Sequence, residues 1–250
     1  MRIAALYDIH GNLPALEAVL ADVRAARVDC IVAGGDVVVG PMSREAIACL
    51  LDCGIETRFI LGNCEVAVLD EIAGRVPAVP PAIRPRIRAT ADQIEGEFVG
   101  LIGGWPKTVR LTIDEIGEAL FCHGTPRDEN EIFTERTAEA HLRPLFDPLE
   151  VPLVVCGHTH MPFDRRVGTT RVVNAGSVGM PFGPPGADWL LLGPDVEPRR
   201  TFYDLQAAAA RIRASGYPDA EDFASTSVLQ PPSAARMLEL FAAAELKRGA

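Results

Sequence analysis

The sequence predicts an α/β fold with a parallel β-sheet. Short apolar runs at residues 2–7, 30–33 and 56–61 alternate with longer segments whose apolar residues recur at helical spacing. Parallel strands need such helical crossovers, because a tight turn between two neighbouring strands makes them antiparallel. The chain has 250 residues, a length that fits one large α/β domain or one domain with an appendage, and its 48% hydrophobic and 23% charged residues are ordinary for a globular protein.

The first part of the chain is predicted to alternate strand, helix, strand, helix and strand. Residues 2–7 form the first strand, and Asn12 is the expected N-cap of the helix that follows. Residues 30–33 form the second strand, Ser43 is the expected N-cap of the second helix, and residues 56–61 form the third strand. We therefore expect three parallel strands that are joined by right-handed crossovers.

Residues 66–106 interrupt this alternation with several prolines and a helical stretch near residues 89–99. We interpret this segment as a helical excursion beside the functional site. A hairpin of residues 108–113 and 119–122 is expected after it, followed by a helix of residues 137–146. Five further strands are expected at residues 153–156, 165–167, 171–173, 188–192 and 199–203.

The end of the chain differs in composition from the rest. It is rich in Ala, Arg and Leu, and helices are expected at residues 207–215 and 233–247. We therefore divide the chain into a main domain of residues 1–205 and a C-terminal helical extension of residues 206–250, which packs on that domain or on a partner.

Charge and hydropathy exclude several classes of protein. A net charge of −10 disfavours nucleic-acid binding, which usually needs a basic face. No run of about 18 apolar residues predicts a membrane span, and the apolar start is too short for a signal peptide, so a cytoplasmic protein is expected. The six cysteines form no C-x-x-C pair, which favours reduced thiols over disulfides.

Polar residues follow five of the predicted strands. Ligands in open α/β sheets bind beyond the carboxyl ends of the strands, so these residues are expected to meet. Four of the five histidines in the chain belong to the set. Its members are Asp8, His10, Asp36, Asn63, His123, His158 and His160.

The types of these side chains indicate two metal ions rather than one. Imidazole, carboxylate and carboxamide groups suit manganese, iron, zinc or nickel, and the sequence does not select among them. A single zinc needs about four ligands, whereas this set has seven members. Paired divalent cations stabilise the oxygens of an in-line displacement, and this chemistry suits phosphate esters.

The order of the motifs resembles that of the calcineurin-like metallophosphoesterases. The matching motifs are Asp8-x-His10, Gly35-Asp36, Gly62-Asn63-Cys64-Glu65, His123 and Gly157-His158-x-His160. The opening Asp8-Ile9-His10-Gly11-Asn12-Leu13 and the later Asn174-Ala175-Gly176-Ser177 are similar to the bacterial and archaeal branch of that family, which contains small phosphodiesterases. This resemblance spans residues 1 to about 205 and implies a four-layer αββα sandwich.

The resemblance also implies roles for the individual residues. One metal would be held by Asp8, His10 and His160, and Asp36 would bridge to a second metal held by Asn63, His123 and His158. Asp36, Asn63 and His123 are then catalytic residues as well as ligands, and a metal-bridging hydroxide would attack phosphorus. Asn12 and Cys64 are expected to contact the substrate.

Cys64 departs from the common pattern of this family. Many members have His and Asp after Gly-Asn, with the His placed to protonate the leaving group, whereas this chain has Cys64 and Glu65. A small branch similar to this chain also carries Cys there. A neutral thiol is a poor general acid near neutral pH, so we expect a preference for activated esters or diesters. The alternative is that Cys64 only packs beside the metals.

Hydrolysis of a small phosphodiester or phosphomonoester is the leading functional hypothesis. One alternative is a scaffold with reduced catalysis, like the retromer subunit of this fold, but the complete set of seven ligands favours an enzyme. A nuclease is disfavoured by the net charge, and a protein Ser/Thr phosphatase remains a further alternative. No membrane partner is expected, and a homo-oligomer is left open.

Overall fold

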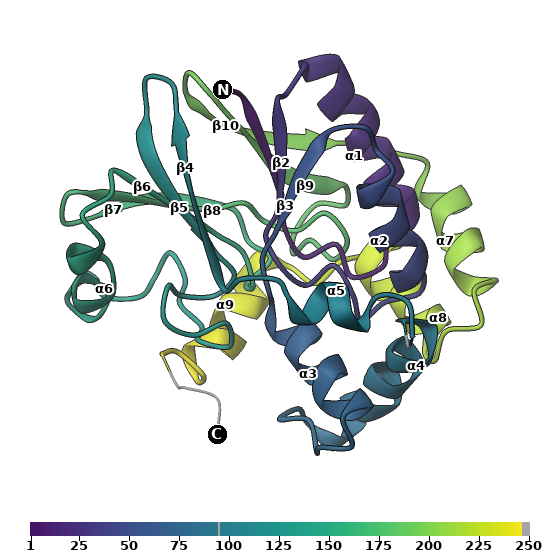
Figure 1. Cartoon of the computed structure of the whole chain (residues 1–250). Coiled ribbons are helices and arrows are strands. Elements are labelled where there is room, and N and C mark those ends of the chain that lie inside the picture. The colour runs from purple at the N-terminus through teal and green to yellow at the C-terminus, as the bar shows by residue number, and fades with distance from the viewer. Residues whose placement is uncertain (95, 247–250) are drawn as a thin grey trace.

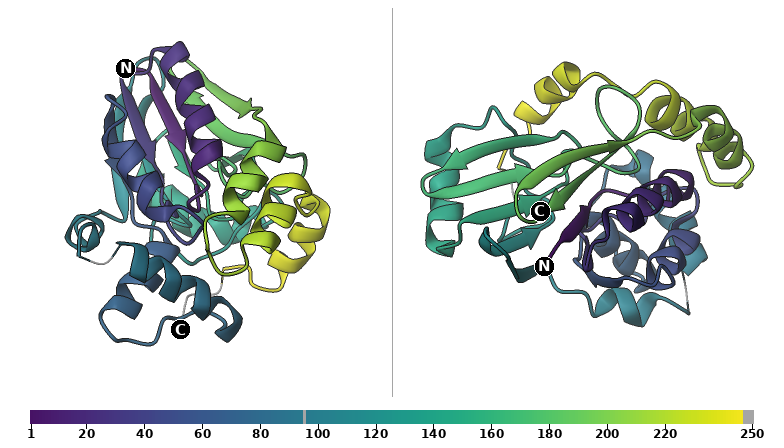
Figure 2. Two further views of the ribbon diagram at one scale, coloured as in Figure 1. Left: turned by 90° about the vertical axis from the view of Figure 1, so that its right-hand side faces the viewer. Right: turned by 90° about the horizontal axis from the view of Figure 1, so that it is seen from above.

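Two stacked β-sheets with helices on both outer faces form the body of the molecule (Figures 1 and 2). The computed structural model describes residues 1–94 and 96–246. The first sheet has the order β10 (Val196–Thr201), β9 (Ala187–Leu192), β1 (Ile3–Leu6), β2 (Cys30–Ala33) and β3 (Glu56–Phe59). The second has the order β4 (Thr108–Ile113), β5 (Gly117–Cys122), β6 (Leu153–Cys156), β8 (Thr170–Asn174) and β7 (Phe163–Val167). The predicted αββα sandwich is confirmed.

The helices belong to three regions of the chain. The first sheet is covered by α1 (Leu13–Ala26) and α2 (Ser43–Leu51), and the second by α6 (Glu139–Phe146), which the short helix η2 (Asp147–Leu149) follows. The excursion contains α3 (Asn63–Ile72), η1 (Pro81–Ile83), α4 (Arg84–Ile94) and α5 (Val99–Gly103). The end of the chain contains α7 (Leu205–Arg213), α8 (Ala220–Phe223), the π-helical turn η3 (Ala224–Leu229) and α9 (Ala234–Ala242).

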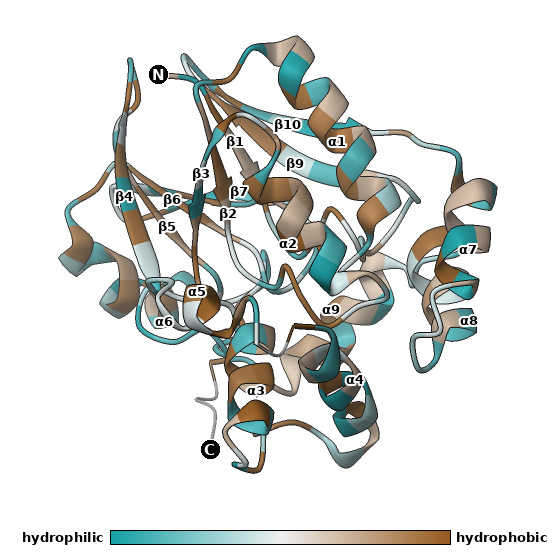
Figure 3. Cartoon of the chain, turned by 45° about the vertical axis from the view of Figure 1, so that its right-hand side comes forward, coloured by the Kyte–Doolittle hydropathy of each residue, from teal (hydrophilic) through white to brown (hydrophobic). Residues whose placement is uncertain are grey.

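Side-chain alternation along β1 explains the layered core. Ala4 and Leu6 pack toward the helices, whereas Ile3 and Ala5 pack between the two sheets, and all four are fully buried. Successive residues of a strand point to opposite faces, so a strand buried on both sides is apolar throughout. The helices instead combine apolar and polar faces, as the colouring of α1 and α2 shows (Figure 3).

The parallel strands bring their carboxyl ends to one edge of the sandwich. β1, β2 and β3 are parallel in the first sheet, and β5, β6 and β8 are parallel in the second. The backbone N–H of His158, after β6, donates to Asp8 Oδ2, after β1, at 2.8 Å, so the strand ends of both sheets meet. Figure 1 shows α3, α5 and α9 near this edge.

The C-terminal extension contacts the main domain at several places. Arg211 of α7 pairs with Glu17 of α1 at 2.6 Å, and Arg86 of α4 pairs with Asp219 and Asp222 at 3.1 and 3.0 Å. Gly183 N–H donates to Pro232 C=O at 2.8 Å. Throughout the described part of the chain, no helix has the length and hydrophobicity needed to cross a bilayer.

Two helix starts differ from the sequence interpretation. Met42, not Ser43, is the N-cap of α2, because the Ser43 hydroxyl bonds instead to the backbone N–H and C=O of Gly40, at 3.1 and 3.0 Å. Helix α3 begins at Asn63, three residues before the start of the predicted helical excursion of residues 66–106. Its N-cap is Gly62, which has no side chain to signal a cap.

The last predicted helix begins as expected but is shorter. Ser233 is the N-cap of α9, with its hydroxyl accepting from Arg236 N–H at 3.3 Å. The helix is described to Ala242, and residue 247, where it was predicted to end, lies outside the described residues.

Candidate metal centre

All seven predicted ligands lie together at the shared edge of the two sheets. Most of them lie in the loops that follow the strands, and five have positive φ values: Asp8 (53°), His10 (48°), Asp36 (52°), His158 (66°) and His160 (56°). Non-glycine residues rarely adopt this left-handed conformation, and it persists only where the surrounding structure enforces it. Backbone hydrogen bonds do so here, such as that from His10 N–H to Asp36 C=O at 2.9 Å.

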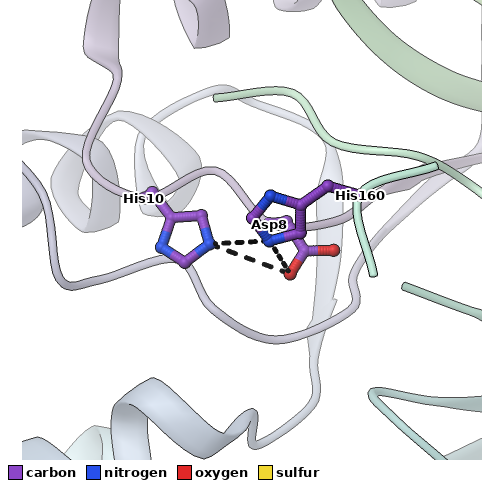
Figure 4. A group of neighbouring side chains, drawn as sticks. All are labelled: Asp8, His10 and His160. Carbon is purple, nitrogen blue, oxygen red and sulfur yellow. Dashed lines mark hydrogen bonds and ion pairs between the residues drawn. The ribbon is translucent and has the colours of Figure 1, made fainter. Parts of the chain in front are cut away.

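The first half of the centre consists of Asp8, His10 and His160 (Figure 4). The Nε2 atoms of His10 and His160 are 3.2 Å apart, and His160 Nε2 is 3.2 Å from Asp8 Oδ1. The ring of His160 also stacks on Phe182, whose ring lies 6.1 Å from that of Phe241 on α9. The sequence interpretation missed this aromatic contact with the C-terminal extension, for which no local motif exists.

The second half consists of Asp36, Asn63, His123 and His158. His123 Nε2 lies 3.0 Å from Asn63 Oδ1 and 3.4 Å from Asp36 Oδ1. A ring nitrogen of His158 completes a cluster with Asp36 and His123 in which all ligand atoms lie within 4.8 Å of one another. Asp36 also faces the first half, because its Oδ2 lies 3.8 Å from His10 Nε2. This position is suitable for a bridging ligand.

Backbone carbonyls set the orientation of three of the imidazoles. His123 Nδ1 donates to Gly34 C=O at 3.0 Å, His158 Nε2 to Asn130 C=O at 3.2 Å and His160 Nδ1 to Met180 C=O at 2.8 Å. A carbonyl only accepts, so each of these nitrogens carries the proton. The other nitrogen of each ring then points its lone pair into the centre once that position is deprotonated, an arrangement typical of metal-binding histidines.

The donor set fits divalent cations. Asp8 Oδ1 is buried and has no hydrogen-bond donor within the described chain, although burial of an unpaired carboxylate oxygen is unfavourable. Two imidazole nitrogens 3.2 Å apart also repel when both present lone pairs. A cation between these atoms removes both costs, and nitrogen and carboxylate ligands suit the borderline metals expected from the sequence.

The charges of the ligands are strongly coupled. Burial lowers the pKa of His123, but attraction to Asp36 and Asp8 outweighs it and raises that pKa to about 10. Burial, together with neighbouring imidazoles, lowers the pKa of His10 and of His158 to about 4. Burial raises the pKa of the Asp8 and Asp36 carboxyls, but the nearby imidazoles outweigh it and hold both pKa values below the usual value. Burial lowers the pKa of His160, but attraction to Asp8 outweighs it and raises that pKa as well, so protons compete with cations at His123 and His160.

Glu65 supports the centre, a role that the sequence interpretation did not assign. Its fully buried carboxylate accepts from the backbone N–H groups of Asp36, Val37, Val38 and Gly62, at 2.8, 2.8, 3.2 and 2.8 Å. Burial and the charge of Asp36 raise the pKa of Glu65 to about 7. The spacing Gly62-x-x-Glu65 is the available signal, because Glu at the third helical position is half of a capping box.

Asn174 and Ser177, from the motif after β8, also hold the ligand loops. Asn174 Nδ2 donates to Gly157 C=O at 2.6 Å, and Ser177 Oγ donates to Asp8 C=O at 2.7 Å. Neither side chain contacts a ligand's metal-binding atom, so both position the backbone from which the ligands project.

The two predicted substrate contacts lie in different surroundings. Asn12 is fully buried, where its Oδ1 accepts from Ala15 N–H at 3.3 Å and its Nδ2 donates to Gly179 C=O at 2.9 Å. It thus caps α1, and its contact with phosphate stays a prediction. Cys64 is half-buried, and its backbone N–H donates to Asp36 Oδ1 at 2.8 Å. Burial and the Asp36 charge raise the pKa of this thiol.

Known proteins share this architecture. The solved structure of hypothetical protein PH1004 from Pyrococcus horikoshii OT3 has a TM-score of 0.78 at 19% identity, over 93% of this chain and 99% of that one. A metallophosphoesterase from Sphaerobacter thermophilus has a TM-score of 0.68 at 28% identity, over 90% of this chain and 97% of that one. No curated protein sequence gave a significant match.

The family itself is shown by the sequence. Residues 1–193 match the model of the calcineurin-like phosphoesterase superfamily domain, and this range contains all seven gathered ligands. The resemblance of the motifs, the αββα sandwich and the match over most of the chain agree. The chain therefore belongs to the calcineurin-like phosphoesterase superfamily, a family of metal-dependent phosphoester hydrolases.

Proposed function

We propose that this protein hydrolyses phosphodiesters or phosphomonoesters with two divalent cations, of manganese, iron, zinc or nickel. The observation that carries the proposal is the convergence of donor atoms from five strand ends, with backbone carbonyls orienting three imidazoles. Such cations supply Lewis acidity and lower the pKa of a coordinated water toward neutrality. A scaffold that binds only partners would not require this complete set.

The protein's own residues divide the work between the two halves of the centre. Asp8, His10 and His160 would hold one cation, Asn63, His123 and His158 would hold the other, and Asp36 would serve as a ligand of both. Glu65 keeps the backbone at Asp36 and Gly62 in place. The acidic character of the chain, with a net charge of −10, favours a small ester over nucleic acid as substrate.

The leaving group limits the range of substrates. Cys64 occupies the position next to Asn63, and its raised pKa makes it reluctant to give up a proton. General acid catalysis typically contributes about 10²–10⁴-fold. We therefore propose that aryl esters and diesters, whose leaving groups need little protonation, are hydrolysed faster than alkyl monoesters.

The test combines metal analysis with kinetics. Purified protein is expected to hold about two divalent cations per chain, and to hydrolyse bis(p-nitrophenyl) phosphate after addition of manganese. Asp36→Asn is expected to lose at least about a hundredfold in activity, whereas the exposed control Glu17→Gln retains it. Absence of both bound metal and hydrolysis would refute the enzyme and favour the scaffold.

A second comparison tests the substrate preference. Cys64→His supplies an imidazole where many family members have one, so alkyl monoester hydrolysis is expected to rise by about tenfold or more while aryl diester hydrolysis changes little. If the unaltered protein already hydrolyses the alkyl monoester as fast as the aryl diester, the proposed preference is wrong.

A further inference from the structure

We propose that the sulfur of Cys64 is an additional ligand of the metal centre, on the side that His10 and Asp36 form. The inference rests on the proposed metal-dependent function and adds a thiolate to its set of nitrogen and oxygen donors. It gives Cys64 a different role from that of a substrate contact or an inert neighbour.

The geometry places the sulfur within reach of a shared cation. Cys64 Sγ, a ring nitrogen of His10 and a carboxylate oxygen of Asp36 all lie within 4.8 Å of one another. Atoms bound to one ion at about 2.0–2.3 Å are separated by at most about 4.6 Å. The three atoms therefore need little or no rearrangement to bind the same ion.

The backbone holds Cys64 in this position. Its N–H donates to Asp36 Oδ1 at 2.8 Å, so the residue is attached to the carboxylate that faces both halves of the centre. Cys64 is the second residue of α3, a ten-residue helix whose positive end favours a negative charge on the sulfur. Burial and the Asp36 charge oppose it by raising the pKa of the thiol, so ionisation of Cys64 requires the bound cation. Asn63 Nδ2 also donates to the sulfur at 3.9 Å.

An independent observation in the same centre indicates a cation. Asp8 Oδ1 is fully buried and has no hydrogen-bond donor among residues 1–94 and 96–246. It lies 3.9 Å from His10 Nε2, which itself belongs to the cluster of Cys64. The sulfur thus borders a centre with an unsatisfied buried carboxylate oxygen, and the inference does not depend on the cysteine alone.

The other five cysteines provide a contrast. Cys30, Cys122 and Cys156 are buried near backbone carbonyls of the two sheets, and Cys53 lies beside Ile55 C=O and the Thr57 hydroxyl. Cys49 lies on α2, half-buried like Cys64 but outside every candidate ligand cluster of the described chain. Cys49 is therefore a matched control.

Ligation by sulfur has two chemical consequences. The thiol proton passes to solvent when the cation binds, and no oxidation or reduction takes place. Thiolate is a softer ligand than carboxylate, so it favours zinc, cobalt or iron over manganese or magnesium. A thiolate bound in this way holds no proton for a leaving group, which accounts for a preference for activated esters without any role for Cys64 as an acid.

Cobalt(II) provides a spectroscopic test that does not depend on activity. A cobalt–thiolate bond gives a charge-transfer absorption in the near ultraviolet, which nitrogen and oxygen ligands do not give. The full-length protein loaded with cobalt is expected to show this band. Cys64→Ser is expected to abolish it, and Cys49→Ser is expected to retain it.

Two further measurements separate the possible failures. Circular dichroism establishes that each variant is folded, and elemental analysis measures cobalt per chain. A folded protein that binds cobalt and hydrolyses esters without the band, or a band that persists in Cys64→Ser, overturns the sulfur ligand alone. Failure of the folded protein to bind any cobalt overturns the proposed metal-dependent function as well.

Discussion

Glu65 offers the sharpest test of how the metal centre is built. The substitution Glu65→Gln keeps the size of the side chain but replaces one carboxylate oxygen by an NH2 group. In the structure Oε1 accepts from Val37 and Val38, and Oε2 accepts from Asp36 and Gly62. Whichever way the amide turns, two backbone N–H groups face a donor in place of an acceptor.

The expected loss follows from the number of hydrogen bonds. Each bond to a charged group contributes about 1.5–3 kcal/mol, so the loss of two destabilises the protein by about 3–6 kcal/mol. For a protein of this size, that corresponds to a fall in Tm of about 6–24 °C. Divalent-cation affinity is also expected to fall by about 10–100-fold, because these N–H groups fix the backbone at Asp36.

Thermal unfolding and metal titration measure the two effects. The control is Glu17→Gln, whose exposed ion pair with Arg211 is worth at most about 1 kcal/mol. Burial and the Asp36 charge raise the pKa of Glu65 to about 7. The measurements are therefore made at pH 8, where the Glu65 carboxylate is ionised. If Glu65→Gln melted and bound metal like Glu17→Gln, the assigned role of the carboxylate would be refuted.

Three other predictions concern the metal centre and the core. Cation affinity should rise with pH, because His123, with a pKa of about 10, is protonated in the metal-free protein and must release its proton on binding. Calorimetry in buffers of different ionisation enthalpy measures that release, and a buffer-independent heat would contradict it. When the free cation concentration is 100 times Kd, removing the cations with a chelator should lower the free energy of unfolding by about 2.7 kcal/mol per site. A Tm that does not change on addition of chelator would contradict this. Phe146→Ala, at a fully buried position on α6, should cost about 3–5 kcal/mol in chemical denaturation without changing the metal content.

The strands, and the side chains that gather at their ends, could be predicted from the sequence because both leave local signals. Buried strands such as Cys30–Ala33 are continuous apolar runs, and Asp36 and Asn63 follow the strands at the edge where α/β proteins bind ligands. The match to the calcineurin-like phosphoesterase domain confirms the family that these motifs suggested. The assignment of each ligand to a metal stays a prediction.

Other features could not be predicted because they depend on contacts distant in sequence. Gly34, Asn130 and Met180 orient the imidazoles through backbone carbonyls, which every residue type has. The start of helix α3 was missed because its cap is a glycine and the carboxylate that completes the cap belongs to Glu65. Ser43 was misplaced because its hydroxyl bonds to the preceding turn, an alternative that serine offers at many positions.

The left-handed backbone of five ligands constrains how this protein can be stabilised by evolution or by design. At about 1 kcal/mol or more for each residue, Asp8, His10, Asp36, His158 and His160 together cost at least about 5 kcal/mol, comparable to the whole stability of a small domain. Glycine would relieve this strain at every one of them but would remove a donor atom each time. Selection for heat resistance alone therefore acts against the ligands, and thermostable variants should be sought at positions away from these turns.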